Sequence, residues 1–281
     1  MTQAPQKSFA DWLVASDIDG TLNNKKRKLP PQNLEAIRRF TAQLGGHFTL
    51  ASGRSVPSMA RHYLNLPLNN TPAIVLNGAG IYDFGKKEML HFNAIDSAGM
   101  AFVEDLFHRF PLTELQVCTQ EDNMIFMARP LFMGPAMLAA DKLPHRNFRR
   151  FEQLPKQGWG KVIFFGLPPT IRKLAKYMES VTAPPVHCMS SSIVTHELLA
   201  PNTHKGTAVL KLAELLGVPA QHTAAIGDYF NDYDMLRSVA VPAVCGQAPD
   251  EMKEIAEFVA CHCNQGAVAS FLEYLERTYA D

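Results

Sequence analysis

Residues 12–21 read WLVASDIDGT, an apolar run followed at once by two carboxylates one residue apart, Asp17 and Asp19. The run predicts a buried strand, and Gly20 and Thr21 are expected to shape the turn that leaves it. A carboxylate leaves water at a high cost unless it meets a cation or hydrogen-bond donors. Adjacent acids at a core strand's end therefore favour a site for a hard metal ion. The alternative is a solvated strand end.

Three further polar segments follow or open predicted core elements. Residues 52–54 (Ser-Gly-Arg) follow the apolar run 48–51, and residues 227–232 (GDYFND) follow the run 223–226. Lys205 opens a segment whose apolar residues recur at helical spacing. Because open α/β sheets bind ligands at the carboxyl ends of their strands, these segments are expected to meet at one edge of a sheet.

The two ends of the chain alternate between strand-like and helix-like runs, which predicts a parallel sheet covered by helices. The expected strands are 12–16, 47–51, 73–76, 222–226 and 241–245, and the expected helices are 31–44, 55–64, 206–216, 232–238, 249–257 and 266–279. Gly45 and Gly217 stand where a glycine commonly ends a helix.

The stretch 83–190 has a different pattern. Residues 115–120 and 124–128 are strand-like and flank a polar Glu-Asp-Asn turn at 121–123, which predicts an antiparallel hairpin. Further strands are expected at 161–165 and 186–192, with a helix at 169–180 between them. This is an α+β unit inserted into an α/β core. Its methionines Met124, Met127, Met133 and Met137 are expected to fill the core, and Arg146, Arg149 and Arg150 to be solvated.

Composition narrows the classes of partner. The 281 residues are 47% hydrophobic and carry 27 basic and 27 acidic side chains, so the chain has no net positive field to attract nucleic acid or an anionic membrane. No apolar stretch approaches the ~20 residues of a membrane helix, and the polar start at 1–7 lacks a secretory apolar region. We expect a soluble cytoplasmic protein.

The five cysteines are odd in number and scattered, which is typical of reduced thiols. The run Cys261-His262-Cys263 has no second cysteine or histidine cluster, so its spacing does not match a structural zinc site.

The ordered set of Asp-x-Asp-Gly-Thr, Ser-Gly-Arg, Lys-Gly and Gly-Asp-x-x-Asn-Asp closely resembles the haloacid dehalogenase (HAD) superfamily of phosphatases. The long insert is similar to that of the Cof-type subgroup, subclass IIB, which carries an α/β cap. The resemblance implies a Rossmann-like parallel-sheet core of residues 1–82 and 191–281. Residues 83–190 would then be the inserted cap, which selects the substrate.

The resemblance also implies roles for individual residues. Asp17 would be the nucleophile that forms an aspartyl-phosphate, and Asp19 the general acid and base. Asp17, Asp228 and the backbone carbonyl of Asp19 would bind Mg²⁺. Lys205 would balance the charge of nucleophile and phosphate, and Asp232 would align the metal ligands and Lys205.

Other residues are candidates for binding phosphate or substrate. Ser52 and the Gly53 amide stand where a helix is expected to begin, so they can hold a phosphate oxygen at its positive end. Asn231 could donate to phosphate or to a bound water, and Arg54 and Asn77 are candidates in substrate-facing loops. The simpler alternatives are that Ser52 is a helix N-cap and that Asn231 and Asp232 cap the helix they precede.

The expected function is therefore Mg²⁺-dependent hydrolysis of small phosphorylated metabolites, with sugar phosphates as the expected substrates by analogy. One alternative is a phosphotransferase or phosphomutase that passes the phosphoryl group from the same nucleophile to another hydroxyl. A second alternative is a phosphate-ligand sensor with vestigial activity. The presence of both acids of the first motif argues against a pure sensor, and no protein partner can be inferred.

Overall fold

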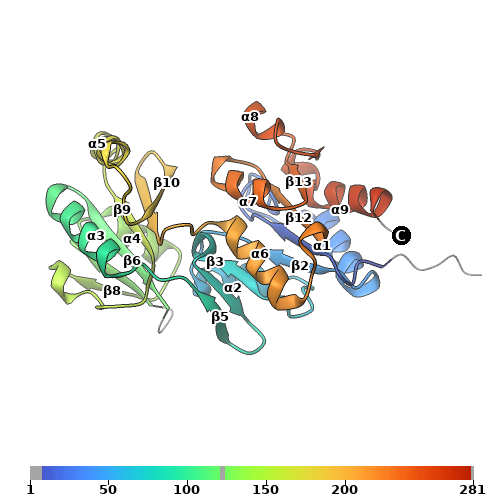
Figure 1. Cartoon of the computed structure of the whole chain (residues 1–281), viewed down its shortest axis with the longest axis horizontal. Helices are drawn as coiled ribbons and strands as arrows, with labels where there is room; N and C mark the ends of the chain where they lie inside the picture. The colour runs from blue at the N-terminus through green and yellow to red at the C-terminus, as the bar shows by residue number, and fades with distance from the viewer. Residues whose placement is uncertain (1–7, 121–123, 280–281) are drawn as a thin grey trace, which may run out of the picture.

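The computed structural model describes residues 8–120 and 124–279, and it divides them into a core and a cap that lie side by side (Figure 1). The expected turn at 121–123 and the polar start at 1–7 lie outside the described residues. Within the described residues, no helix is both long and apolar enough to cross a membrane.

The core is built on a five-stranded sheet in the order β14-β13-β12-β1-β2, and every neighbouring pair in it is parallel. Its strands are β1 (Leu13–Ser16), β2 (His47–Leu50), β12 (Thr223–Gly227), β13 (Val241–Val244) and β14 (Phe258–Val259). β1 lies between β2 and β12, so the residues that follow these three strands emerge at one edge of the sheet.

Helices cover both faces of this sheet, which confirms the predicted α/β class. One face packs against α1 (Pro31–Arg38), α2 (Val56–Tyr63) and α9 (Ala267–Thr278), and the other against α6 (Lys205–Leu216), α7 (Tyr233–Ser238) and α8 (Asp250–Lys253). A five-residue π turn, Arg39–Gln43, prolongs α1 to the predicted end, where Gly45 has a φ of +79°. Gly217 ends α6 with a φ of +72°.

The helix predicted over 249–257 is mostly wrong, because α8 ends at Lys253. The residues that follow turn and form β14, which pairs with β13 as the edge strand. A two-residue strand has no periodicity of its own, so only its pairing distinguishes it from the end of a helix.

A small antiparallel sheet joins the core to the cap. It contains β3 (Ala73–Val75), β4 (Gly80–Asp83) and β5 (Glu88–Phe92), and a parallel bridge between Ala51 and Ile74 places it next to β2.

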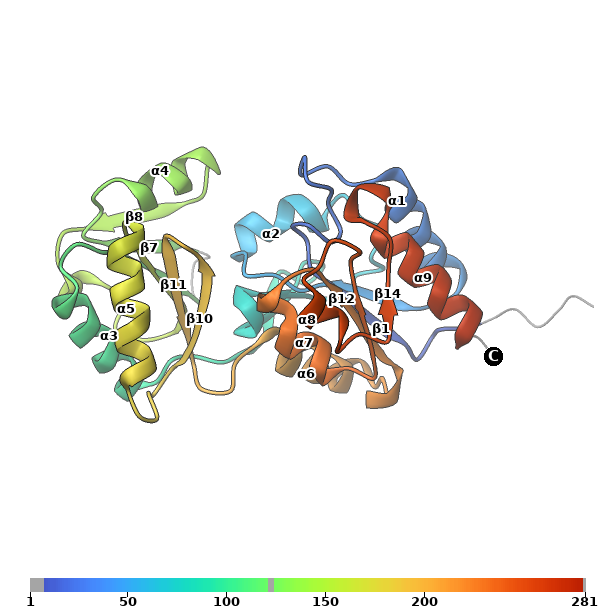
Figure 2. The same ribbon diagram turned by 90° about the horizontal axis from the view of Figure 1, so that it is seen from above.

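The cap is a six-stranded sheet in the order β10-β11-β9-β6-β7-β8. Its strands are β6 (Glu114–Thr119), β7 (Ile125–Ala128), β8 (His145–Phe148), β9 (Trp159–Phe165), β10 (His187–Ser192) and β11 (Thr195–Leu199). Helices α3 (Ser97–Arg109) and α5 (Pro168–Ser180) cover the face away from the core (Figure 2). The opposite face, together with α4 (Met133–Ala140), is turned toward the core. The hairpin of β6 and β7 is antiparallel, as predicted.

The chain passes from core to cap, and back again, at later residues than the predicted cap boundaries of 83 and 190. β4 and β5 pair with β3 beside the core, whereas β11 pairs with β9 in the cap sheet. The crossing segments are therefore 93–96 and 200–204, and Asn93 Nδ2 donates to Thr203 Oγ1 at 2.6 Å to join them. The sequence places the end of the cap near β10, because only the pairing of β11 with β9 assigns β11 to the cap.

The arginines and methionines for which the sequence predicts burial or exposure in the cap agree with the structure only in part. Arg146, Arg149 and Arg150 are exposed, as predicted. Met127 is fully buried, but Met137 is 51% exposed and lines a cavity, so the prediction that it fills the core is wrong.

Candidate active site

Asp17 lies at the carboxyl end of β1 and is 5% exposed. Its backbone N–H donates to the Ile226 carbonyl of β12 at 3.1 Å, which fixes the loop against the neighbouring strand. Gly20 has a φ of +85°, and a Cβ there would lie 2.3 Å from Asp228 Oδ2. The turn after β1 therefore needs glycine for its conformation and for the close approach of the Asp228 carboxylate.

Thr21 is a turn residue, as predicted, and its hydroxyl also donates to Asp228 Oδ1 at 3.4 Å. Gln247, which sequence reasoning missed, holds the same turn from the other side, because its Nε2 donates to the Gly20 carbonyl at 2.6 Å. Asp228 thus sits against a turn that is fixed by two side chains.

Lys205, the first residue of α6, is buried between two carboxylates. Its Nζ donates to Asp17 Oδ1 at 2.5 Å and to Asp232 Oδ1 at 2.6 Å. Burial acts to lower the pKa of Lys205, but Asp17 and Asp232 outweigh it and hold the pKa above its usual value. The ammonium is therefore a fixed positive charge that orients both acids.

The other oxygen of Asp232 accepts from the Asp228 backbone N–H at 3.1 Å. Asp232 precedes α7 but makes no side-chain capping bond, and Asn231 lies inside the short turn Phe230–Asp232. The alternative that these two residues only cap the helix is therefore wrong for Asp232.

The carboxylates outnumber the positive charge at this edge. Single oxygens of Asp17, Asp228 and Asp232 lie within 4.8 Å of one another. Burial raises the pKa of Asp17 to about 7, with Asp232 and Asp228 adding to the rise and Lys205 opposing it. Burial and the charge of Asp232 raise the pKa of Asp228 to about 6. Hard oxygen donors with this excess negative charge fit a divalent cation such as Mg²⁺.

Asp19 stands apart from this group of acids. Its side chain is 49% exposed and pairs with Arg54, whose Nη2 lies 2.6 Å from Asp19 Oδ2. Arg54 is held in turn by a bond from Nη1 to Ser58 Oγ at 3.0 Å. The two residues therefore form one wall of the cavity in front of Asp17.

Ser52 and Gly53 follow β2. The Ser52 backbone N–H donates to the Ile74 carbonyl, and its own carbonyl accepts from the Asn77 N–H. α2 begins at Val56 with Ser55 as its N-cap, which agrees with the helix predicted over 55–64. Ser52 and Gly53 therefore do not stand at the start of the helix as expected, and the alternative that Ser52 is its N-cap is wrong. The positive end of α2 lies three residues further along the chain.

Asn77 has a φ of +56°, and its side chain points to the cap. Its Nδ2 donates to Glu197 Oε2 of β11 at 2.6 Å. The same Glu197 oxygen lies 2.6 Å from Lys161 Nζ of β9, and that ammonium donates to the Gly53 carbonyl at 3.1 Å. These bonds connect the cap sheet directly to the loop after β2.

One cavity of about 480 Å³ brings these residues together between core and cap. The predicted residues that line it are Asp17, Asp19, Ser52, Gly53, Arg54, Asn77, Asp228 and Asn231. Lys205 and Asp232 lie behind Asp17. Sequence reasoning missed the cap residues Lys161 and Glu197, although charged residues inside the apolar runs of β9 and β11 were the signal that could have found them.

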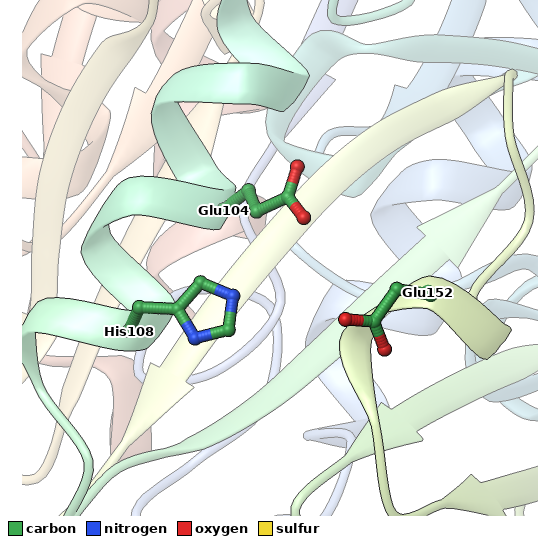
Figure 3. Close-up of side chains that lie close together, drawn as sticks. All are labelled: Glu104, His108 and Glu152. Carbon is green, nitrogen blue, oxygen red and sulfur yellow. The ribbon is translucent and has the colours of Figure 1, made fainter.

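A second group of potential ligands lies on the outer side of the cap. Glu104 and His108 project from α3 toward Glu152 of a short helical turn (Figure 3). His108 and Glu152 are exposed, so water solvates this group and nothing beyond its composition points to a ligand. All five cysteines are free, and Cys261-His262-Cys263 is not among the potential metal-binding groups of the described residues.

Known proteins are similar to this chain over most of its length. A family model described as haloacid dehalogenase-like hydrolase matches residues 14–272. An HMP-PP phosphatase of Serratia proteamaculans is 29% identical over 276 residues, which cover 95% of this chain and 96% of the relative. The pyridoxal phosphate phosphatase YbhA of Escherichia coli K12 is 24% identical over 269 residues, which cover 92% and 97%.

Two solved structures share the fold. A haloacid dehalogenase-like hydrolase from Bacteroides thetaiotaomicron superposes with a TM-score of 0.81 at 22% identity, covering 94% of this chain and 99% of that chain. The HAD subclass IIB sugar phosphatase BT4131 superposes with a TM-score of 0.76 at 18% identity, covering 94% and 98%.

Proposed function

The chain belongs to the haloacid dehalogenase-like hydrolases, and we propose that it is a Mg²⁺-dependent phosphomonoesterase that acts on small phosphorylated metabolites through an aspartyl-phosphate. The observation that carries the proposal is the buried carboxylate of Asp17. Lys205 holds it by one oxygen, and it opens onto the cavity beside Asp228.

Asp17 is suited to be the nucleophile because its orientation is fixed before substrate binds. In the proposed reaction a carboxylate oxygen of Asp17 forms a bond to phosphorus as the bond from phosphorus to the ester oxygen breaks. Water then attacks the aspartyl-phosphate, which releases inorganic phosphate and restores the carboxylate. Lys205 would stabilise the negative charge that builds up around Asp17 and the phosphoryl group during both steps.

Asp19 is the proposed general acid and base. It would give a proton to the leaving alcohol and take one from the attacking water. In this structure Arg54 neutralises its carboxylate. We propose that a substrate phosphate competes for Arg54, whose guanidinium suits phosphate as well as carboxylate, and that this exchange frees Asp19.

We propose that Asp17, Asp228 and the backbone carbonyl of Asp19 would hold Mg²⁺. The proposal is supported by the carboxylate oxygens of Asp17 and Asp228, which lie within 4.8 Å of each other. When bound, the ion would neutralise phosphate oxygens and so make attack by an anion possible. Asp232 is engaged by Lys205 and by the Asp228 N–H, so its proposed role is to position these groups. Ser52, the Gly53 amide and Asn231 line the cavity where they can donate to phosphate oxygens. Asn77 is proposed to contact substrate from the edge of the cap.

The relatives supply the substrate class only broadly. One is named for pyridoxal phosphate, others for HMP-PP, and a structural neighbour is named a sugar phosphatase. Small phosphorylated molecules are common to all three, and the sugar phosphates that the family resemblance implies are one class among them.

The test is to incubate the purified protein with Mg²⁺ and a panel of phosphorylated metabolites, and to measure inorganic phosphate. Release of phosphate that disappears in Asp17→Asn supports hydrolysis. Transfer to a second hydroxyl, seen as a new phosphorylated product without phosphate release, would instead identify a phosphotransferase or mutase. Binding of phosphorylated ligands without turnover would identify a sensor.

A further inference from the structure

The face of the cap sheet that is turned toward Asp17 has an apolar side chain at its centre and polar side chains on either side. In β9, Lys161, Ile163 and Phe165 alternate with Val162 and Phe164, and the latter two pack in the cluster under α3 and α5. Ile163 pairs with Gln116 of β6 on one side and with Glu197 of β11 on the other. A row of three side chains across three strands therefore faces the active-site cavity, with an apolar centre and polar ends.

The charged groups of this face are already compensated. Lys161 is the only cationic residue among the described cap residues that line the cavity, and its ammonium pairs with Glu197 at 2.6 Å with both side chains less than 10% exposed. Asp141 adds a negative charge. The cap side of the cavity thus has no net positive charge to receive a second phosphate or a carboxylate of the substrate.

The rest of this wall is apolar. Ile125, Leu138, Leu143, Ile163 and Phe165 line it, and Met137 stands at its exposed edge. A sugar places a hydroxyl on nearly every carbon, and each hydroxyl that loses water without a new partner costs about 1–3 kcal/mol. A flat apolar ring loses little by the same transfer and gains from burying its faces.

We propose that the leaving group of the preferred substrate is an uncharged, largely apolar planar ring that packs on Ile163, with any polar edge directed to Gln116 or to the Lys161–Glu197 pair. This inference rests on the phosphatase activity proposed above and names the substrate class of the same site. It assigns substrate selection to the row Gln116, Ile163 and Glu197.

Three phosphate esters of primary alcohols test whether the site prefers an apolar ring, a sugar or a second phosphate in the leaving group. Because all three are esters of primary alcohols, their intrinsic reactivity is similar. They are benzyl phosphate, glucose 6-phosphate and fructose 1,6-bisphosphate, with acetyl phosphate as a probe that needs little from the cap. We expect kcat/KM for benzyl phosphate to exceed that for glucose 6-phosphate by at least about tenfold, with the bisphosphate the poorest of the three.

The outcomes distinguish the two proposals. Turnover of acetyl phosphate together with a preference for glucose 6-phosphate or the bisphosphate would overturn the inference and leave the phosphatase activity standing. No phosphate release from any of the four compounds with Mg²⁺ would overturn both.

A matched pair of variants tests the residue assignment. Ile163→Val and Ile163→Thr introduce side chains of nearly equal shape. They differ in that threonine has a hydroxyl where valine has a methyl group. The ratio of kcat/KM for benzyl phosphate over glucose 6-phosphate is expected to be about 3- to 10-fold lower in Ile163→Thr than in Ile163→Val. Because both substrates are measured on one preparation, partial unfolding does not alter the ratio. Equal ratios in the two variants would remove Ile163 from substrate selection.

Discussion

Gly20→Ala perturbs the proposed metal site through a single added methyl group. The new Cβ would lie 2.3 Å from Asp228 Oδ2, and real Cβ atoms essentially never come closer than 3.0 Å to another heavy atom. The Asp228 carboxylate and the turn at Gly20 must therefore separate by about 0.7 Å, the difference between these two distances, whereas metal–ligand distances tolerate about ±0.2 Å. We expect Mg²⁺ to bind about 10- to 100-fold more weakly, as with other changes that displace a ligand's support.

Gly217→Ala is the matched control for backbone strain. Gly217 has a φ of +72°, close to the +85° of Gly20, but nothing lies within 4 Å of a Cβ added there. Each variant is expected to lose about 1–2 kcal/mol of folding free energy from the left-handed conformation alone. That loss lowers the Tm of a protein of this size by a few degrees. Only Gly20→Ala should also change the metal dependence.

The assay is phosphate release from acetyl phosphate as a function of Mg²⁺ concentration, with thermal unfolding measured on the same samples. Gly20→Ala should need a higher Mg²⁺ concentration for half-maximal rate, and Gly217→Ala should match the wild type. An unchanged Mg²⁺ dependence in Gly20→Ala would refute the placement of Asp228 at the metal. The same shift in both variants would assign the effect to stability instead.

Three further outcomes are expected. Asp17→Asn should reduce kcat by several orders of magnitude while the protein remains folded by circular dichroism, and retention of more than about a tenth of wild-type kcat would exclude Asp17 as nucleophile. Chelation should abolish phosphate release, and Mg²⁺ should restore it better than Ca²⁺, which takes longer and looser coordination; full activity in metal-free protein would contradict this. Lys161→Met should lower the free energy of unfolding, measured with a chemical denaturant, by about 3–5 kcal/mol, because the buried Glu197 loses its ammonium partner. Adding Glu197→Gln should recover part of that loss, and a double variant as unstable as the single one would argue against the pairing.

Much of the core could be read from local sequence. An apolar run followed by Asp17 and Asp19 identifies a strand end with acids that packing does not explain, and the alternation of strands and helices then brings the other strand ends to the same edge. The helix ends at Gly45 and Gly217 could also be predicted from the sequence, because the left-handed conformation that these residues adopt strongly favours glycine. The family resemblance added roles to residues whose positions these patterns had already indicated.

The tertiary structure decided what depends on contacts between distant parts of the chain. Lys205 meets Asp17 across 188 positions of sequence, and nothing local shows that one ammonium serves both Asp17 and Asp232. β11 belongs to the cap only because it pairs with β9, and this pairing carries Glu197 to Lys161 and Asn77. A strand's alternation shows which residues share a face, but its neighbours in the sheet determine what that face meets. For that reason the acids at the core's edge were visible in the sequence, and the cap wall opposite them was not.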